Sequence, residues 1–389
     1  MTEQASGRSK RVEFIDLLRG WAVLVMIETH VVNATLHPDI FSTQFFQYLK
    51  FLNGLVAPSF LFASGLAYAI TTRRKLNDYL ALGSPLVRQI GRLSFVLIIA
   101  YALHLPKFSF SLLLNNTTPL EWQSFFQVDV LQAIAMSLLL LQGLLLLVRR
   151  EVRFYYVTII LAALIVIATP LMWQVDSWEV IPWPIAAYLN GVRHSLFPLF
   201  PWAAFLFAGA FTGFLFLRVR ENFPEEALRK YLWRMLIGAT ALIVASMVIE
   251  PFASRIYPTY EYWLTSPSFL LLRLGCVLLL TALMVWKEWK QGVSPKSVVT
   301  LIGRESFLVY VLHLLLIYGD FGKFNFQKWV NHEFGYPEAI LTALLLVGLM
   351  YAIAAAWSRL RKRNPVLKRR VELLALAIVL GVFFFGPGE

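Results

Sequence analysis

Two ionisable residues, Arg19 and His30, lie in a largely apolar stretch (residues 14–33) that is long enough to cross a bilayer as a helix. Charged groups inside a spanning helix are costly, and they commonly mark functional sites. The two residues are eleven positions apart, so a helix places them on one face, about 16 Å apart along its axis. His30 could act as a general base or proton relay, or it could be a structural histidine that bonds a neighbouring helix. Arg19 could bind a phosphate, or it could pair with Asp16 three residues earlier.

Later apolar stretches carry further groups of this kind. Asp129 begins the fourth stretch, where its carboxylate could cap the helix or orient a catalytic imidazole. His313 lies deep in the ninth stretch, three residues after Tyr310 and on the same helix face. We take it as a second candidate for the site, with a structural role as the alternative. His37 lies just beyond the first stretch, where an ordinary exposed loop position explains it equally well.

The composition indicates the class of protein to which the chain belongs. Of the 389 residues, 58% are hydrophobic and only 15% are charged, which is typical of a protein with many membrane-spanning helices. We therefore predict an all-α, polytopic integral membrane protein. The formal net charge of +12 does not indicate nucleic-acid binding, because the Lys and Arg residues form short clusters between apolar segments.

Several kinds of site have no counterpart in the sequence. There is no Walker loop, dinucleotide glycine motif, His-Glu-x-x-His zinc motif or Gly-x-Ser-x-Gly elbow. The single cysteine, Cys276, cannot form an internal disulfide, and no cysteine spacing suits a metal. We therefore predict neither an ATP-driven machine nor a zinc protease, and no metal site.

About eleven apolar segments are candidate spans. They cover residues 14–33, 52–71, 90–105, 128–148, 155–173, 197–217, 234–250, 268–286, 298–318, 338–358 and 371–385. The third and the last are short, and the last could instead be re-entrant or interfacial. No connection is long enough for a large soluble domain, so we expect residues 1–389 to form a single transmembrane domain.

The basic clusters lie on alternate connections, and the intervening connections hold aromatic residues, prolines and acids. By the positive-inside rule the basic side is the cytoplasm. This places the N-terminus in the cytoplasm, with residues 1–13 as a tail and residues 359–370 as a basic loop. We expect the first span to remain uncleaved, and we expect the protein to lie in a bacterial-type plasma (inner) membrane.

Four motifs resemble those of a known enzyme family, the heparan-alpha-glucosaminide N-acetyltransferase-like membrane proteins. The motifs are Ile15-Asp16-x-Leu18-Arg19-Gly20-x-Ala22 with Met26 and His30, Ala57-Pro58-x-Phe60-Leu61-Phe62-x-Ser64-Gly65, Asp129-Val130-Leu131-Gln132, and Gly303-Arg304-x-Ser306-x-x-x-Tyr310-x-x-His313. The spacing from Arg19 to His30 also resembles the signature of the wider acyltransferase-3 group. The likeness covers nearly the whole chain in order.

The resemblance implies transfer of an acetyl or other acyl group from a coenzyme A thioester in the cytoplasm to a sugar beyond the membrane. It implies functional roles for Arg19, His30, Asp129 and His313. In the family the catalytic histidine follows the first helix, which makes His37 a competitor of His30.

Arginine suits bidentate contacts with phosphate, so a cytoplasmic mouth rich in arginine could hold the phosphates of acetyl-CoA. The predicted cofactor-binding residues are Arg19, Arg88, Arg92 and Arg304. The predicted partners are an acyl-CoA donor, a sugar or glycan acceptor and the lipid bilayer, with a homodimer as one option for assembly. A transporter or exporter of glycans or lipid-linked sugars, with the intramembrane histidines relaying protons or binding cargo, is the alternative function.

Overall fold

Helices make up most of the described chain, which comprises residues 12–257, 260–294, 297–319 and 325–386 of a computed structural model. No β-strand occurs in these residues, so the predicted all-α class is confirmed. The long helices are α1 (Glu13–Thr35), α3 (Val56–Leu80), α4 (Ser84–Ala102), α7 (Val130–Val148), α8 (Glu151–Met172), α11 (Leu199–Asn222), α12 (Ala227–Ile256), α13 (Pro267–Gln291), α17 (Tyr336–Arg363) and α18 (Pro365–Phe385). The shorter ones are η1 (Pro38–Ser42), α2 (Gln44–Asn53), α5 (Phe110–Asn115), α6 (Pro119–Phe126), α9 (Ser177–Val180), α10 (Trp183–Ala186), α14 (Val298–Arg304), α15 (Ser306–Tyr318) and α16 (Phe326–Val330).

Membrane-spanning helices are numerous, as the composition predicts. Among the described residues, eight helices are long and apolar enough to cross a membrane, or up to nine if the bent pair α14–α15 forms one span. The eight do not include α1 or α18, because both helices carry several charged side chains among their apolar residues. The polytopic class is thus confirmed, while the total of eleven spans stays a prediction.

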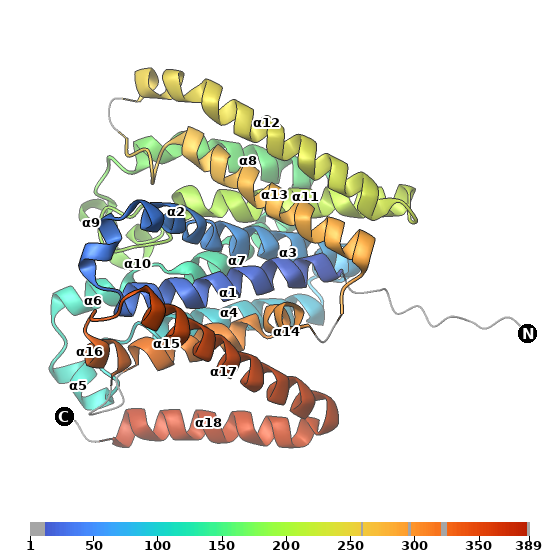
Figure 1. The fold of residues 1–389 in the computed structure, drawn as a ribbon. Helices are drawn as coiled ribbons and strands as arrows, with labels where there is room; N and C mark the ends of the chain where they lie inside the picture. Colours follow the sequence, from blue (N-terminus) through green and yellow to red (C-terminus); the bar gives the residue numbers. More distant parts are fainter. Residues whose placement is uncertain (1–11, 258–259, 295–296, 320–324, 387–389) are drawn as a thin grey trace, which may run out of the picture.

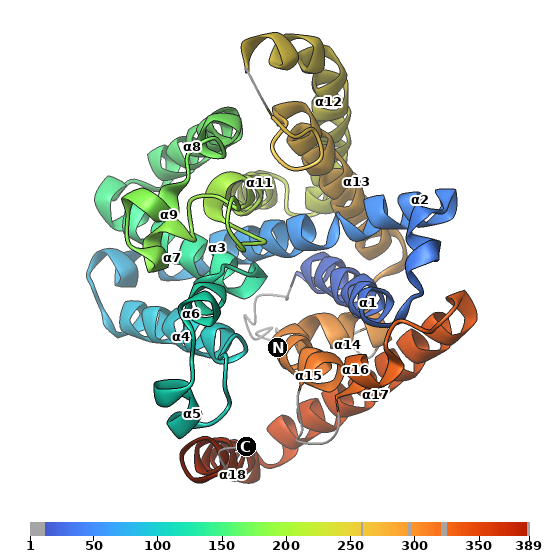
Figure 2. The same cartoon turned by 90° about the vertical axis from the view of Figure 1, so that its left-hand side faces the viewer.

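Helix α1 lies near the centre of the bundle when the molecule is viewed along its helices (Figure 2). It packs against α3, α13, α14, α15 and α17. Helices α12 and α13 form a pair at one edge, and α18 lies at the opposite edge against α17 and α5. The helix that carries Arg19 and His30 therefore packs among several others, although it contains Asp16, Arg19 and Glu28.

The connections of the bundle gather at two ends (Figure 1). The start of α1 lies at one end with the α11–α12, α13–α14 and α17–α18 connections, and we call this the basic end. The short helices α5, α6, α9, α10 and α16 lie at the other, which we call the aromatic end. This arrangement agrees with the predicted alternation of the connections, and the assignment of the basic end to the cytoplasm stays a prediction.

Close contact between α1 and α14 depends on two glycines. A Cβ added at Gly20 would overlap the backbone carbonyl of Val299, and one added at Gly303 would overlap that of Asp16. The two helices therefore meet backbone to backbone, which only residues without a side chain allow. This contact fixes the position of α14, and with it Arg304, relative to the face of α1 that bears Arg19.

The ninth predicted segment, residues 298–318, is not one helix. It divides into α14 and α15, which meet at an angle of 89°. Glu305 lies at the bend, and its side chain is only 5% exposed. Both of its carboxylate oxygens accept hydrogen bonds from Arg361 of α17. The bend thus divides the predicted span into two shorter helices, and both pack against α1 and α17.

Candidate active site

Two cavities lie between the central helices, and each holds one of the residue types singled out by the sequence. The arginine cavity has a volume of about 570 Å³, and its lining includes Arg19, Arg92, Arg304 and Arg361. The histidine cavity has a volume of about 500 Å³, and its lining includes His30, His104, Gln127, Asp129, Gln132 and Tyr318. Arg19 is near the start of α1 and His30 is near its end, so the first cavity lies toward the basic end and the second toward the aromatic end.

Two residues contribute to the linings of both cavities. Leu131 of α7 and Tyr310 of α15 contribute to the walls of both. The Tyr310 hydroxyl lies 3.4 Å from the Asp129 carboxylate, to which it donates. Leu131 and Tyr310 therefore lie where the two cavities are close to each other.

The His30 side chain and backbone both form hydrogen bonds with Tyr318 of α15. Its Nδ1 lies 3.2 Å from the Tyr318 hydroxyl, and that hydroxyl also donates to the backbone carbonyl of His30 at 3.2 Å. A hydroxyl has only one proton, so this geometry leaves its oxygen to accept from Nδ1–H. The unprotonated nitrogen of a neutral His30 is then Nε2, which is the atom that a general base needs.

His313 lies behind His30 and does not line the histidine cavity. The two ring centroids are 5.2 Å apart. The His313 side chain is fully buried, and its Nδ1 lies 2.9 Å from the carbonyl of Val309. Within the described residues its Nε2 has no hydrogen-bond partner. The structure thus brings the two predicted intramembrane histidines together, with His30 in front.

Asp129 caps a helix and also lies near an imidazole, and its role in orienting a catalytic imidazole stays a prediction. One carboxylate oxygen accepts a hydrogen bond of 2.6 Å from the amide of Val130 at the start of α7. The other lies 3.7 Å from Nε2 of His104. The imidazole that pairs with this carboxylate is that of His104.

His104 is a site residue that the sequence analysis missed. Its Nδ1 lies 2.9 Å from Nε2 of Gln127, which can only donate, so the proton of a neutral His104 is on the nitrogen that faces Asp129. It belongs to the third predicted segment, so the rule that singled out His30 could have found it. The ammonium group of Lys107 lies 2.8 Å from the carboxylate of Glu121, and this ion pair ties α6 to the connection that carries His104. The Lys107 ammonium, together with hydrogen bonds from Thr118, lowers the pKa of the Glu121 carboxyl to about 2.

His37 lies outside both cavities. It precedes η1, its side chain is 51% exposed, and its Nδ1 is 3.4 Å from the carboxylate of Asp39. The position matches the ordinary exposed loop histidine that was the alternative to a catalytic role.

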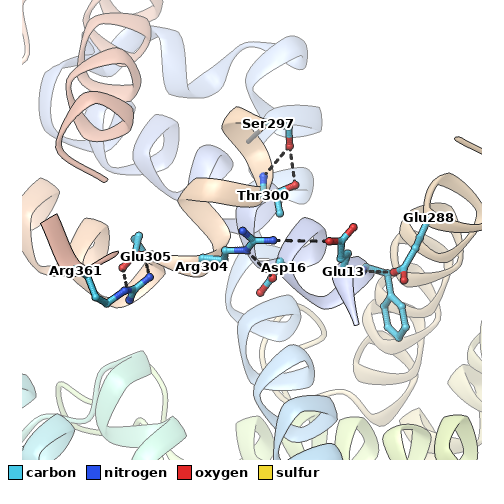
Figure 3. A network of polar contacts seen from close by, with 9 residues as sticks. Glu13, Asp16, Glu288, Ser297, Thr300, Arg304, Glu305 and Arg361 are labelled. Atoms are coloured by element: carbon cyan, nitrogen blue, oxygen red, sulfur yellow. Dashed lines mark hydrogen bonds and ion pairs between the residues drawn. The ribbon is translucent and has the colours of Figure 1, made fainter. Parts of the chain in front are cut away.

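The predicted arginines divide into three groups. Arg19 and Arg92 line the arginine cavity, whereas Arg88, one turn earlier on α4, is exposed and does not line it. Arg304 lines it too, but its Nε donates to Asp16 at 3.2 Å and Glu13 lies 3.9 Å away (Figure 3). This guanidinium therefore holds α14 to α1 as well as facing the cavity.

Arg361 was not among the predicted cofactor-binding residues, yet it lines the same cavity from α17. It bonds Glu305 at the bend of α14–α15, as Figure 3 shows. A further cavity of about 390 Å³ adjoins this region, and it shares Arg19, Ala67 and Thr71 with the arginine cavity. The basic end thus has two adjoining cavities, whose combined volume exceeds what a simple phosphate needs.

Residues 11–251 match the catalytic family model of heparan-alpha-glucosaminide N-acetyltransferase, which is more than half of the chain. The chain belongs to this family. The match includes Arg19, His30, Asp129 and His104, and it ends before α14, α15 and α17. No curated protein matches the chain. Among the described residues, no group of His, Cys, Asp or Glu side chains could hold a metal ion.

Proposed function

We propose that this member of a membrane acetyltransferase family transfers an acyl group, with acetyl as the first candidate, from acyl-CoA to an amine or hydroxyl of a sugar. The observation that carries the proposal is that an arginine-lined cavity and a histidine-lined cavity share Leu131 and Tyr310 in their walls. Membership of the family supports acetyl transfer. In this proposal the donor occupies the arginine cavity and the acceptor occupies the histidine cavity.

The charge and shape of the arginine cavity suit coenzyme A as the donor. Coenzyme A carries phosphates at one end and its thioester at the end of a long flexible arm. Guanidinium groups bind phosphate in a planar, bidentate manner, and Arg19, Arg92 and Arg361 line one cavity. With the phosphates there, the arm would extend along α1 toward Leu131 and Tyr310. This direction matches the separation between Arg19 and His30, which is about 16 Å along a helix.

The hydrogen bonds of His30 leave its Nε2 free of a proton, so this atom could act on the acceptor. Its Nε2 would take the proton of the acceptor as the acceptor nitrogen or oxygen attacks the carbonyl carbon of the thioester. The carbonyl electron pair moves to oxygen and then returns as the carbon–sulfur bond breaks. The thiolate leaves with the electron pair of the broken carbon–sulfur bond, and the proton on His30 neutralises it to the free thiol. Asp129 and His104 would stabilise the positive charge that His30 carries between these steps.

Transfer across the membrane follows if the basic end is cytoplasmic. Acyl-CoA would then bind from the cytoplasm and the sugar from the opposite side. The clustering of basic connections at the end nearest the arginine cavity supports this orientation.

The test uses purified full-length protein, radiolabelled acetyl-CoA and a panel of amino sugars and neutral sugars. We expect release of free thiol that depends on a sugar, together with a labelled sugar product. The proposal is wrong if acetyl-CoA neither binds nor turns over with any of these acceptors. Sugar flux into protein-containing vesicles without thioester turnover would favour a transporter instead.

A further inference from the structure

The histidine cavity contains a buried amide that no other described residue satisfies. Gln132 lines this cavity from α7, one turn after Asp129, and its side chain is fully buried. Within the described part of the chain, neither its Nε2 nor its Oε1 has a hydrogen-bond partner. An unsatisfied buried polar group costs about 1–3 kcal/mol, so this amide is expected to find its partner in a ligand or in water within the cavity.

The other buried or half-buried side chains that could donate in this cavity already have hydrogen-bond partners. Tyr310 donates to Asp129, Tyr318 donates to the His30 carbonyl, and Gln127 contacts His104. Asn33 also lines the cavity but is exposed. Gln132 is therefore the buried side-chain donor in this cavity that remains available to a substrate.

The place of Gln132 in the chain also matters. It follows Leu131, which forms part of the wall between the two cavities. A thioester that arrives past this wall would bring its carbonyl group into the histidine cavity beside the amide. His30 lines the same cavity, so the amide and the base would act on one reacting centre.

We propose that the side-chain amide of Gln132 is an oxyanion donor for the acyl transfer, an inference that rests on the proposed function. As the acceptor attacks, the carbon–nitrogen or carbon–oxygen bond forms and the carbonyl electron pair moves to oxygen. Nε2–H of Gln132 donates to that negative oxygen. When the pair returns to reform the carbonyl, the carbon–sulfur bond breaks and the thiolate departs. The donor is preorganised because the amide is already buried and positioned before the charge develops.

The experiment compares Gln132→Met with Gln142→Met in full-length protein. Gln142 is a matched control because it lies on the same helix, is only 2% exposed, and also has an Nε2 without a partner among the described residues, yet it lines neither cavity. Methionine has nearly the volume of glutamine and lacks the donor. Removal of one oxyanion donor typically lowers kcat by about 10²–10³-fold.

We expect Gln132→Met to lower kcat by this factor while the KM values for acetyl-CoA and sugar change only a few-fold, because the lost contact forms mainly in the transition state. Gln142→Met should keep kcat close to that of the unaltered protein. Both variants should fold, which thermal unfolding and acetyl-CoA binding would verify.

Equal kcat values for the two variants would overturn the proposal, as would an effect of Gln132→Met confined to the KM for the sugar. Gln132→Leu provides a second variant, which also lacks any hydrogen-bond donor at this position. If it retains full kcat, the oxyanion role is refuted even should the methionine variant fail to fold. A lack of turnover in the unaltered protein would instead refute the proposed function itself, so the two failures are distinguishable.

Discussion

The hydrogen bond between Tyr318 and His30 provides the sharpest test of how the base is prepared. Tyr318→Phe removes the hydroxyl that contacts both Nδ1 and the backbone carbonyl of His30, each at 3.2 Å. It keeps the aromatic ring, whose centroid lies 5.6 Å from that of His30 in an edge-on contact. The substitution therefore removes the control over the tautomer and leaves the packing in place.

The size of the effect follows from the strength of such bonds. A net contribution of about 0.5–1.5 kcal/mol is typical for a neutral hydrogen bond, and 1.36 kcal/mol corresponds to a factor of ten in rate. We expect Tyr318→Phe to lower kcat by up to about tenfold. Replacement of the base itself by His30→Gln should lower kcat by on the order of 10²–10⁴-fold.

The double variant separates a positioning role from an independent one. If Tyr318 acts through His30, then adding Tyr318→Phe to His30→Gln should cause no further loss, because residues that act as a unit are not additive. The assay follows thiol release from acetyl-CoA with saturating sugar, and acetyl-CoA binding is measured separately. A tenfold loss that persists in the His30→Gln background would refute the tautomer argument, and a fully active His30→Gln protein would refute the role of His30.

Three further predictions concern topology, donor binding and the loop histidine. Cysteines introduced by Lys75→Cys and Gln123→Cys should react with impermeant reagents from opposite sides of the membrane, and labelling from one side would contradict the proposed orientation. Arg19→Ala should weaken acetyl-CoA binding by about tenfold or more, in calorimetry or ligand-binding assays, while Arg88→Ala stays within about twofold because it does not line the arginine cavity; equal effects would contradict this division. His37→Ala should keep near-normal kcat, and a loss comparable to that of His30→Gln would move the catalytic role to the loop.

Local helix geometry made part of the site predictable. The shared face of Arg19 and His30 depends only on the helical repeat, and the structure places the two residues in neighbouring cavities as this geometry requires. By contrast, the proximity of His104 to Asp129 depends on how α4 and α7 rotate against each other. Hydrophobic periodicity does not determine that rotation, so the sequence offered no means of choosing between His30 and His104 as the neighbour of the carboxylate.

The bend at Glu305 shows a second limit of sequence patterns. The stretch from Val298 to Tyr318 satisfies the hydropathy of a span, and nothing local requires it to break. The partner of Glu305 is Arg361, 56 positions away on α17. Arg88 and Arg92 lie one turn apart on α4, but only Arg92 lines the arginine cavity. The packing of α4 against other helices decides this difference, and the local sequence does not reveal it.

The position of Leu131 and Tyr310 in the walls of both cavities has a consequence for how the transmembrane voltage is distributed through the protein. Where hydrated cavities enter from both ends, the transmembrane voltage falls mainly across the material that separates them. Moving one elementary charge through 100 mV requires about 2.3 kcal/mol. If transfer proceeds as proposed, the neutral acetyl group crosses this field without electrical work, while the charged phosphates of the donor stay in the arginine cavity. Export of the group would then not depend on the membrane potential.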